Sequence, residues 1–206
     1  MLRTVTMAAL ALAALPALAQ TGPAHLRPTR DVAVTYRMEG GSPQQPKEMR
    51  MAWDVSTERQ RIEAPGAPGW MLIDRKANTA VMVMDAQRML MQIPSSAAAA
   101  MMQDPPADTV FTPRGTDRIA GTACNLWETT ITAGKSTVCL TEDGVMLRAV
   151  TELSARPGLP QGGTMRMEAT ELRYGTVDPS HFTLPEGYQT MQAPPPNQPG
   201  GQPPAR

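Results

Sequence analysis

Methionine is the residue type in this sequence whose spacing could support chemistry. The chain has 206 residues and 16 methionines. Side chains alternate between the two faces of a β-strand, so a Met-x-Met motif in a strand places two thioethers on one face. Four such pairs occur: Met49 with Met51, Met82 with Met84, Met89 with Met91, and Met165 with Met167.

Two interpretations of these methionines remain open. Thioethers are soft ligands for Cu(I), although no His or Cys accompanies any pair and the pairs lie on different predicted strands. Methionine also lines irregular apolar interiors, because it is flexible and polarizable. Such an interior is either a packed core or a cavity for a hydrophobic ligand without a metal. The candidate cavity residues are Met49, Met51, Trp53, Met82 and Met84.

The two cysteines, Cys124 and Cys139, predict a disulfide if the protein is exported to an oxidising compartment. The disulfide can form only if the hairpin between the two cysteines turns at a suitable position. A hairpin that turns at residues 133–134 would place Cys124 too far along its strand, because bridged Cα atoms lie within about 7 Å of each other. The bridge therefore requires a turn nearer Ile131, or a bulge. A redox-active thiol pair is the alternative, but the sequence contains no Cys-x-x-Cys motif.

Other chemistry-bearing motifs are scarce, so we expect no enzyme, catalytic residue, metal or cofactor. The sequence contains no Gly-x-Ser-x-Gly, His-Glu-x-x-His or phosphate-binding loop motif, and its histidines, His25 and His181, fall in predicted loops. Paired acid/base carboxylates are a further alternative, for which the candidates are Asp54, Glu58, Asp74 and Asp85. Nineteen Lys and Arg balance nineteen Asp and Glu, which argues against nucleic acid as a partner.

The N-terminus predicts export to the periplasm. Residues 1–19 resemble a secretory signal peptide, with an apolar stretch over 7–19 and a small-x-small cleavage site at 17–19. A buried N-terminal helix is disfavoured because Pro16 would break it. No later apolar run reaches the roughly 20 residues of a spanning helix, and no Cys follows the cleavage site for acylation. We therefore expect no stable membrane anchor.

The rest of the chain predicts a mainly β domain with one or a few short helices. Residues 20–29 form a loose lead, 30–192 the domain, and 193–206 a disordered proline-rich tail. Apolar residues alternate with polar ones in about eight to ten segments, without βαβ alternation, which favours a curved antiparallel sheet or half-open β-barrel. The predicted strands cover 31–39, 48–56, 59–63, 70–74, 80–85, 88–93, 116–132, 135–141, 145–153 and 164–174. A helix over 96–103, capped by Ser95, either packs on the barrel or forms a lid.

Residues 178–188, Asp-Pro-Ser-His-Phe-Thr-Leu-Pro-Glu-Gly-Tyr, resemble the closing segment of the periplasmic outer-membrane lipoprotein carriers and, more closely, that of their uncharacterised relatives. The resemblance extends loosely over residues 31–188, through Ile119-Ala120-Gly121 before Cys124 and Thr141-Glu142-Asp143-Gly144. It implies a half-open antiparallel barrel covered by a helix, an apolar cavity between them, and an inward Phe182. Neither a full set of lid helices nor a cavity arginine can be assigned from the sequence.

These observations predict a periplasmic, non-enzymatic protein that binds an acyl chain or lipid-like ligand in a half-barrel cavity. The first alternative is an envelope protein that uses the same sheet to bind a protein partner or to act as a sensor. The second is a Met-rich copper-binding protein.

Overall fold

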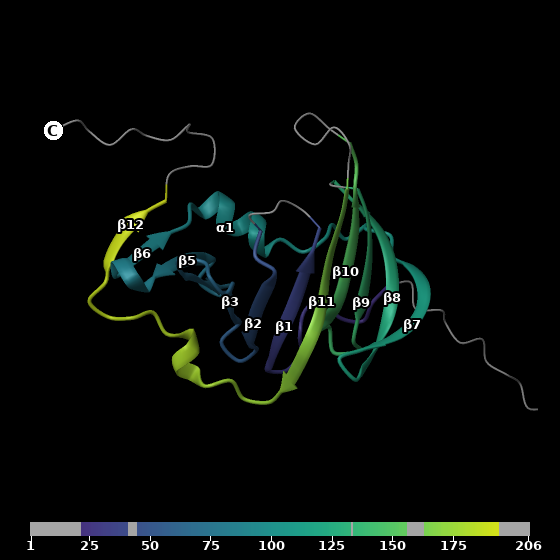
Figure 1. Ribbon diagram of the computed structural model, residues 1–206, viewed down its shortest axis with the longest axis horizontal. Helices are drawn as coiled ribbons and strands as arrows, with labels where there is room; N and C mark the ends of the chain where they lie inside the picture. Colours follow the sequence, from purple (N-terminus) through teal and green to yellow (C-terminus); the bar gives the residue numbers. More distant parts are fainter. Residues whose placement is uncertain (1–21, 41–44, 133, 156–162, 194–206) are drawn as a thin grey trace, which may run out of the picture.

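One continuous sheet organises the protein (Figure 1). The computed structural model describes residues 22–40, 45–132, 134–155 and 163–193, so the expected signal peptide and all but the first residue of the tail lie outside it. The described ranges contain twelve strands, one α-helix and two 3-10 helices. Their bounds are β1 Val32–Glu39, β2 Glu48–Asp54, β3 Arg59–Glu63, β4 Trp70–Asp74, β5 Thr79–Met84, η1 Asp85–Gln87, β6 Met89–Gln92, α1 Ser95–Met102, β7 Thr112–Ile119, β8 Thr122–Ile131, β9 Gly134–Leu140, β10 Met146–Leu153, β11 Gly163–Tyr174, η2 Pro179–Phe182 and β12 Gln189–Gln192.

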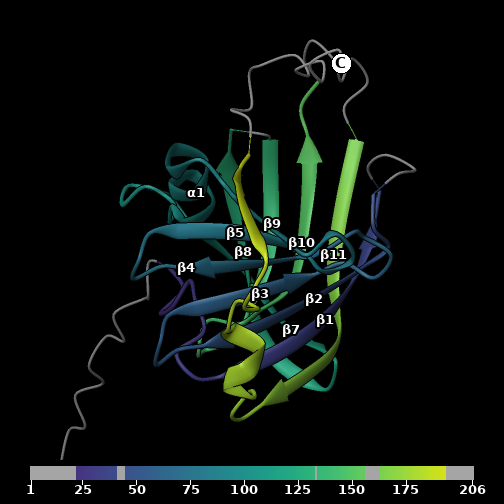
Figure 2. The same ribbon diagram turned by 90° about the vertical axis from the view of Figure 1, so that its left-hand side faces the viewer.

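The strand order is β12-β6-β5-β4-β3-β2-β1-β11-β10-β9-β8-β7. Every neighbouring pair is antiparallel except β12 with β6. The sheet curves so strongly that β7, at one edge, also contacts β11. In Figure 2, β1–β5 cross in front of β8–β11 at a steep angle. The predicted fold class, a mainly β protein with a curved and open antiparallel sheet, is confirmed.

Alternating residues set the two faces of the sheet, as the sequence predicted. Val32, Val34 and Tyr36 on β1 are buried. Their partners on β2 are Trp53, Met51 and Met49, and residues directly opposite each other share a face. We call this side of β1–β6 the inner face and the other side the outer face.

The segment 116–132, expected as one strand, is two. It divides at Ala120 and Gly121, whose φ angles of 47° and 76° are both left-handed. Two consecutive left-handed residues form the tight turn whose twist suits an antiparallel hairpin, so β7 and β8 pair directly. The strand count also exceeds the expected eight to ten because β12 was missed. Its four residues carry no alternating pattern and are held by pairing with β6.

The helix α1 packs on the inner face of the sheet over β4 and β5. Its buried residues, Ala98 and Met102, contact Ile73 and Ala80. The N-cap position is Pro94, which makes no capping hydrogen bond through its side chain, so the predicted cap at Ser95 is wrong. Within the described ranges, no helix is long and apolar enough to cross a membrane.

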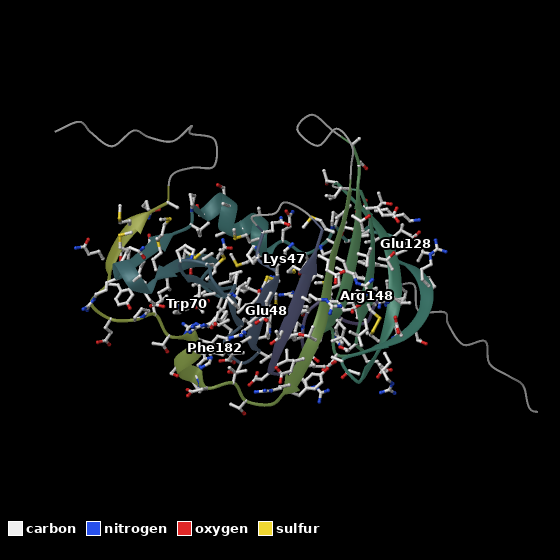
Figure 3. The ribbon with its side chains drawn as sticks, in the orientation of Figure 1. Lys47, Glu48, Trp70, Glu128, Arg148 and Phe182 are labelled. Atoms are coloured by element: carbon white, nitrogen blue, oxygen red, sulfur yellow. A yellow bond between two sulfur atoms is a disulfide. The ribbon has the colours of Figure 1, made fainter. Side chains whose placement is uncertain are left out.

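Residues 175–188 cross the outer face rather than closing the barrel from inside. Asp178 accepts a hydrogen bond from the backbone N–H of Ser180 and starts η2. Phe182 is buried against Trp70 and its neighbours on β4 and β5, and Figure 3 shows Phe182 near Trp70. The expectation of an inward Phe182 is therefore correct for burial and wrong for the face. A further strand, β12, comes after this segment, so the segment connects β11 to β12 and does not end the sheet.

The disulfide between Cys124 and Cys139 is confirmed, with 5.4 Å between the two Cα atoms, and the thiol-pair alternative is wrong. The β8–β9 hairpin closes between Ile131 and Gly134, and Leu126 lies opposite Cys139. The hairpin therefore closes one residue nearer Ile131 than expected, and the bridge joins Cys124 to its diagonal rather than its directly opposite neighbour.

Candidate ligand-binding cavity

A cavity of about 220 Å³ lies between the inner face of β1–β3 and the segments that cover it. The covering segments are the N-terminal lead, the last turn of α1 and the start of β10. Most of the lining is apolar. The lining residues are Leu26, Arg27, Pro28, Val32, Val34, Tyr36, Met51, Trp53, Gln60, Arg75, Met101, Gly144, Val145 and Met146.

Two of the five candidates from the sequence, Met51 and Trp53, line this cavity. Met49 lies on the inner face opposite Tyr36 and packs against the same core, but it does not reach the cavity. Met82 and Met84 lie on β5, also on the inner face, and are not among the lining residues. The alternation of side chains along the strands therefore places all five residues on the inner face, but only Met51 and Trp53 meet at the cavity.

Two buried polar side chains in the lining are bonded to the protein itself. Tyr36, only 2% exposed, donates its hydroxyl proton to the carbonyl oxygen of Met146 at 2.8 Å, and burial raises its pKa well above the usual value. The Nε2 amide of Gln60 donates to the sulfur of Met51 at 2.7 Å. Because the Tyr36 hydroxyl and the Gln60 amide are both hydrogen-bonded to protein atoms, this part of the cavity lining presents an apolar surface to a ligand.

Arg75, which the sequence did not single out, also lines the cavity. Its guanidinium carbon lies 5.5 Å from the centroid of the Trp53 ring, and Nη1 donates to the carbonyl oxygen of Met102 at 2.7 Å. Its Nε is buried and has no hydrogen-bond partner among the residues that the structure describes. Burial lowers the pKa of Arg75 and Arg27 lowers it further, while the nearby carboxylates of Asp104 and Glu58 act in the opposite direction. Arginine nevertheless stays charged, so within the described residues Arg75 keeps one cationic N–H, at Nε, without an acceptor.

A second hollow, of about 550 Å³, adjoins the cavity on the surface. Arg27 and Arg75 line both spaces and so lie at their boundary, and Arg27 is paired with Asp104 at 3.0 Å. The remaining lining is mainly polar and contributed by α1 and two turns. The lining residues are Arg27, Glu58, Arg75, Asn78, Ser96, Ala99, Ala100, Met102 and Gln103. An apolar space therefore meets a polar one at two arginines.

No sequence signal marked Arg75. It lies in the β4–β5 turn, which the sequence predicted only as a connection. Its neighbours at the cavity come from segments far along the chain, such as Met101 and Val145. Local pattern cannot bring such residues together, because periodicity determines the face of an element and not what that face meets.

A charged groove of about 570 Å³ lies across β1–β3 and β11. Its floor includes the small outer-face residues Ala33 and Ala52, which are directly opposite each other. Arginine and glutamate alternate along the strands at its sides, as in the pair of Arg50 with Glu48 at 2.8 Å. Other charged lining residues are Arg61, Glu63, Glu171 and Arg173, and His181 also lines the groove. We call this the outer groove.

Three of the four carboxylates considered for acid/base chemistry have structural contacts, and the fourth, Glu58, lines the hollow beside Arg75. Asp74 pairs with Arg59 at 2.8 Å. Asp85 accepts hydrogen bonds from the Trp70 indole and the Tyr188 hydroxyl. Asp54 accepts one from the hydroxyl of Ser56. Within the described ranges, no group of three or more His, Cys, Asp or Glu side chains could hold a metal ion.

Comparison with known proteins gives one family match. A family model described as "Domain of unknown function (DUF4412)" matches residues 35–157. No curated protein matches the sequence.

Solved structures share the fold at low sequence identity. An uncharacterised conserved protein from Thermus thermophilus is 12% identical, and the alignment covers 80% of this chain and 91% of that chain at a TM-score of 0.53. A chain of the MucA/MucB complex from Pseudomonas aeruginosa is 13% identical, with 82% and 61% covered and a TM-score of 0.56. This chain therefore spans less than two thirds of that one. A LolA superfamily protein from Nitrosomonas europaea also aligns, at 10% identity, 78% and 94% coverage and a TM-score of 0.40.

The expected relation to proteins of unknown function is confirmed by the family match, and the fold is shared with the Thermus thermophilus protein and with the chain of the MucA/MucB complex.

Proposed function

Because the chain belongs to the DUF4412 family, whose function is unknown, we propose a function from its geometry: it binds an amphiphilic ligand that has an acyl chain and an anionic head. The apolar end occupies the cavity on the inner face, and the head lies against Arg75. One observation carries the proposal. A charged, half-buried arginine with an unpaired Nε stands where an apolar cavity meets a polar hollow.

The volume of the cavity limits what enters it. An apolar cavity of about 150 Å³ accepts one benzene molecule, whereas pockets for drug-sized ligands span about 300–1,000 Å³. At about 220 Å³, the cavity holds one short apolar segment, such as the end of an acyl chain. A whole lipid does not fit, so the rest of the ligand would lie in the adjoining hollow.

The charge of Arg75 favours an anionic head. Leaving a buried donor unsatisfied costs about 1–3 kcal/mol, and more for a charged group. A carboxylate that accepts from Nε would remove this cost. It would also offset the repulsion between Arg75 and Arg27 that lowers the pKa of Arg75. A fatty acid has both features.

The proposal includes the compartment and the mode of action. We propose a periplasmic protein that acts by binding and carries out no reaction. The signal-like residues 1–19 support export, and the disulfide fits an oxidising compartment.

Arg75→Met should weaken fatty-acid binding by about 10-fold or more, because a hydrogen bond to a charged group contributes about 1.5–3 kcal/mol. Binding of the matching fatty alcohol, which has no carboxylate, should change little. Titration of the wild type, Arg75→Met and Arg75→Lys with both ligands, followed by quenching of Trp53 by brominated chains, measures this. Equal losses for acid and alcohol would mean that Arg75 only shapes the cavity. No binding by the wild-type protein would overturn the proposed function.

Met51→Trp tests whether the cavity is the acyl site. The larger side chain should fill the cavity and abolish binding of both ligands, while stability should fall only by the loss of the Gln60 contact with the Met51 sulfur. In a close-packed core the same change would cost about 1–3 kcal/mol. Met49→Trp is the matched control because Met49 lies on the same strand and face outside the cavity, so binding should persist. Thermal melts and ligand titrations on both variants distinguish the cases. A destabilised Met51→Trp protein that still binds the fatty acid would contradict the assignment.

A second candidate function is the binding of an envelope protein. The structure that shares this fold in the MucA/MucB complex is one component of a protein assembly. The observation that favours this candidate here is the outer groove, whose alternating charges suit an extended polypeptide. It lies on the opposite face of the sheet from the cavity. Substituting Arg50 and Arg173 therefore separates the two functions, because only binding in the outer groove would respond.

A further inference from the structure

Two Met-x-Met motifs that are separate in sequence lie side by side in the sheet. On β5 and β6, Met82 is directly opposite Met91, and Met84 is directly opposite Met89. Residues i and i+2 share a face, and directly opposite residues have Cβ atoms about 4.5–5.5 Å apart. These four residues, the methionine quartet, therefore form a two-by-two block on the inner face.

Further methionines extend the block on both sides. Met71 on β4 is opposite Met82, and Met191 on β12 is opposite Met91. Four adjacent strands thus carry a methionine in the same row. Met71 also packs against the core under α1, whereas Met191 is 50% exposed and lies at the rim. The row therefore runs from the core to solvent.

The composition of the two faces shows that strand structure alone does not explain these methionines. The outer face of β5 and β6 carries Val81, Val83 and Leu90, which pack with residues 177–188. Such β-branched and aliphatic residues are the usual choice in strands. The same strands place methionine on the inner face, where all four members of the quartet are only half-buried. Thioethers therefore gather on the accessible side.

We propose that the methionine quartet, Met82, Met84, Met89 and Met91, binds a soft monovalent metal ion such as Cu(I), with Met191 as an additional thioether at the rim. Thioethers are neutral, soft ligands, which favour Cu(I) over hard cations. The objection from the sequence, that the pairs lie on different strands, is removed because β5 and β6 are adjacent. The site is separate from the cavity, since none of the quartet lines it.

The test uses Cu(I) competed against a chromogenic Cu(I) chelator, with Ag(I) as a redox-inert probe. The full chain should retain one equivalent of Cu(I) and no Zn(II). The double variant Met82→Leu with Met91→Leu conserves side-chain volume. It should bind Cu(I) at least about 10-fold more weakly, the smallest loss expected when groups supporting a metal site are removed. The matched control is Met165→Leu with Met167→Leu, the Met-x-Met pair of β11, which should bind as the parent does.

A second measurement does not depend on the variants. With methionine methyl groups labelled by ¹³C, Ag(I) should shift the resonances of the quartet and leave those of Met165 and Met167 in place. The proposal is overturned if the parent retains no Cu(I), if the quartet variant binds as tightly as the parent, or if Ag(I) shifts resonances throughout the chain.

Discussion

Replacing Phe182 by alanine is expected to lower the free energy of unfolding by about 3–5 kcal/mol, the usual range when a fully buried aromatic side chain is truncated. Phe182 is 2% exposed and anchors residues 177–188 on the outer face of β4 and β5. Phe182 is the one buried side chain of this segment, while Val177, Leu184 and Tyr188 add partly buried contacts and the Tyr188 hydroxyl donates to Asp85. Arg61 stacks over Trp70 and donates to the carbonyl oxygen of His181 at 3.0 Å, but the pair is partly exposed. Loss of Phe182 should therefore release the segment as a unit.

Chemical denaturation measures the loss, and hydrogen exchange at β12 reports the release, because β12 follows the segment and pairs only with β6. Phe111→Ala is the matched control, since Phe111 is the other phenylalanine of the chain and is half-buried. It should cost much less. Fatty-acid binding at the inner face should survive in the folded Phe182→Ala protein. A loss below about 1 kcal/mol would mean that the segment does not depend on this anchor.

The hairpins of the first half could be predicted because strand alternation carries the information locally. Val32, Val34 and Tyr36 show a clean period of two, and one face of β1 is buried as that pattern requires. The β7–β8 turn was missed because its first residue is Ala120 rather than Asn, Asp or Gly, the residues that usually signal such a turn. Gly121 is the one turn-forming residue of this pair, and a single glycine within an alternating stretch does not by itself mark a turn.

The placement of Phe182 could not be predicted from the residues near it. An apolar residue between turns signals burial, but either face of the sheet offers an apolar surface. The outer face of β4 and β5 carries Trp70, Leu72, Val81 and Val83 and needs a cover, and the segment after β11 supplies it. This choice depends on strand order, which a single sequence does not specify.

The candidate site shows the same limit. Parity correctly placed Met51 and Trp53 on one face, because a one-residue shift in register would move every side chain to the other face. The alternation along each strand does not indicate that the cavity ends before β5, or that Arg75 reaches the cavity from the β4–β5 turn. The pairing of the Met82 and Met89 motifs likewise depends on the β5–β6 register.

Reducing the disulfide is expected to lower the free energy of unfolding by about 3 kcal/mol, the value of the chain-entropy model for a loop of about 15 residues. The bridge joins neighbouring strands that already pair, so reduction acts mainly by freeing the unfolded chain. Replacing Cys124 and Cys139 together by alanine should cost more than reduction, because both side chains lie in the main core and truncation leaves a void. Denaturation curves of the oxidised, reduced and double-alanine proteins separate the two contributions. Fatty-acid binding should be retained after reduction, because neither cysteine lines the cavity. If the reduced protein unfolds at the same denaturant concentration as the oxidised one, the hairpin alone holds β8 and β9 together, and the cross-link does not stabilise the fold.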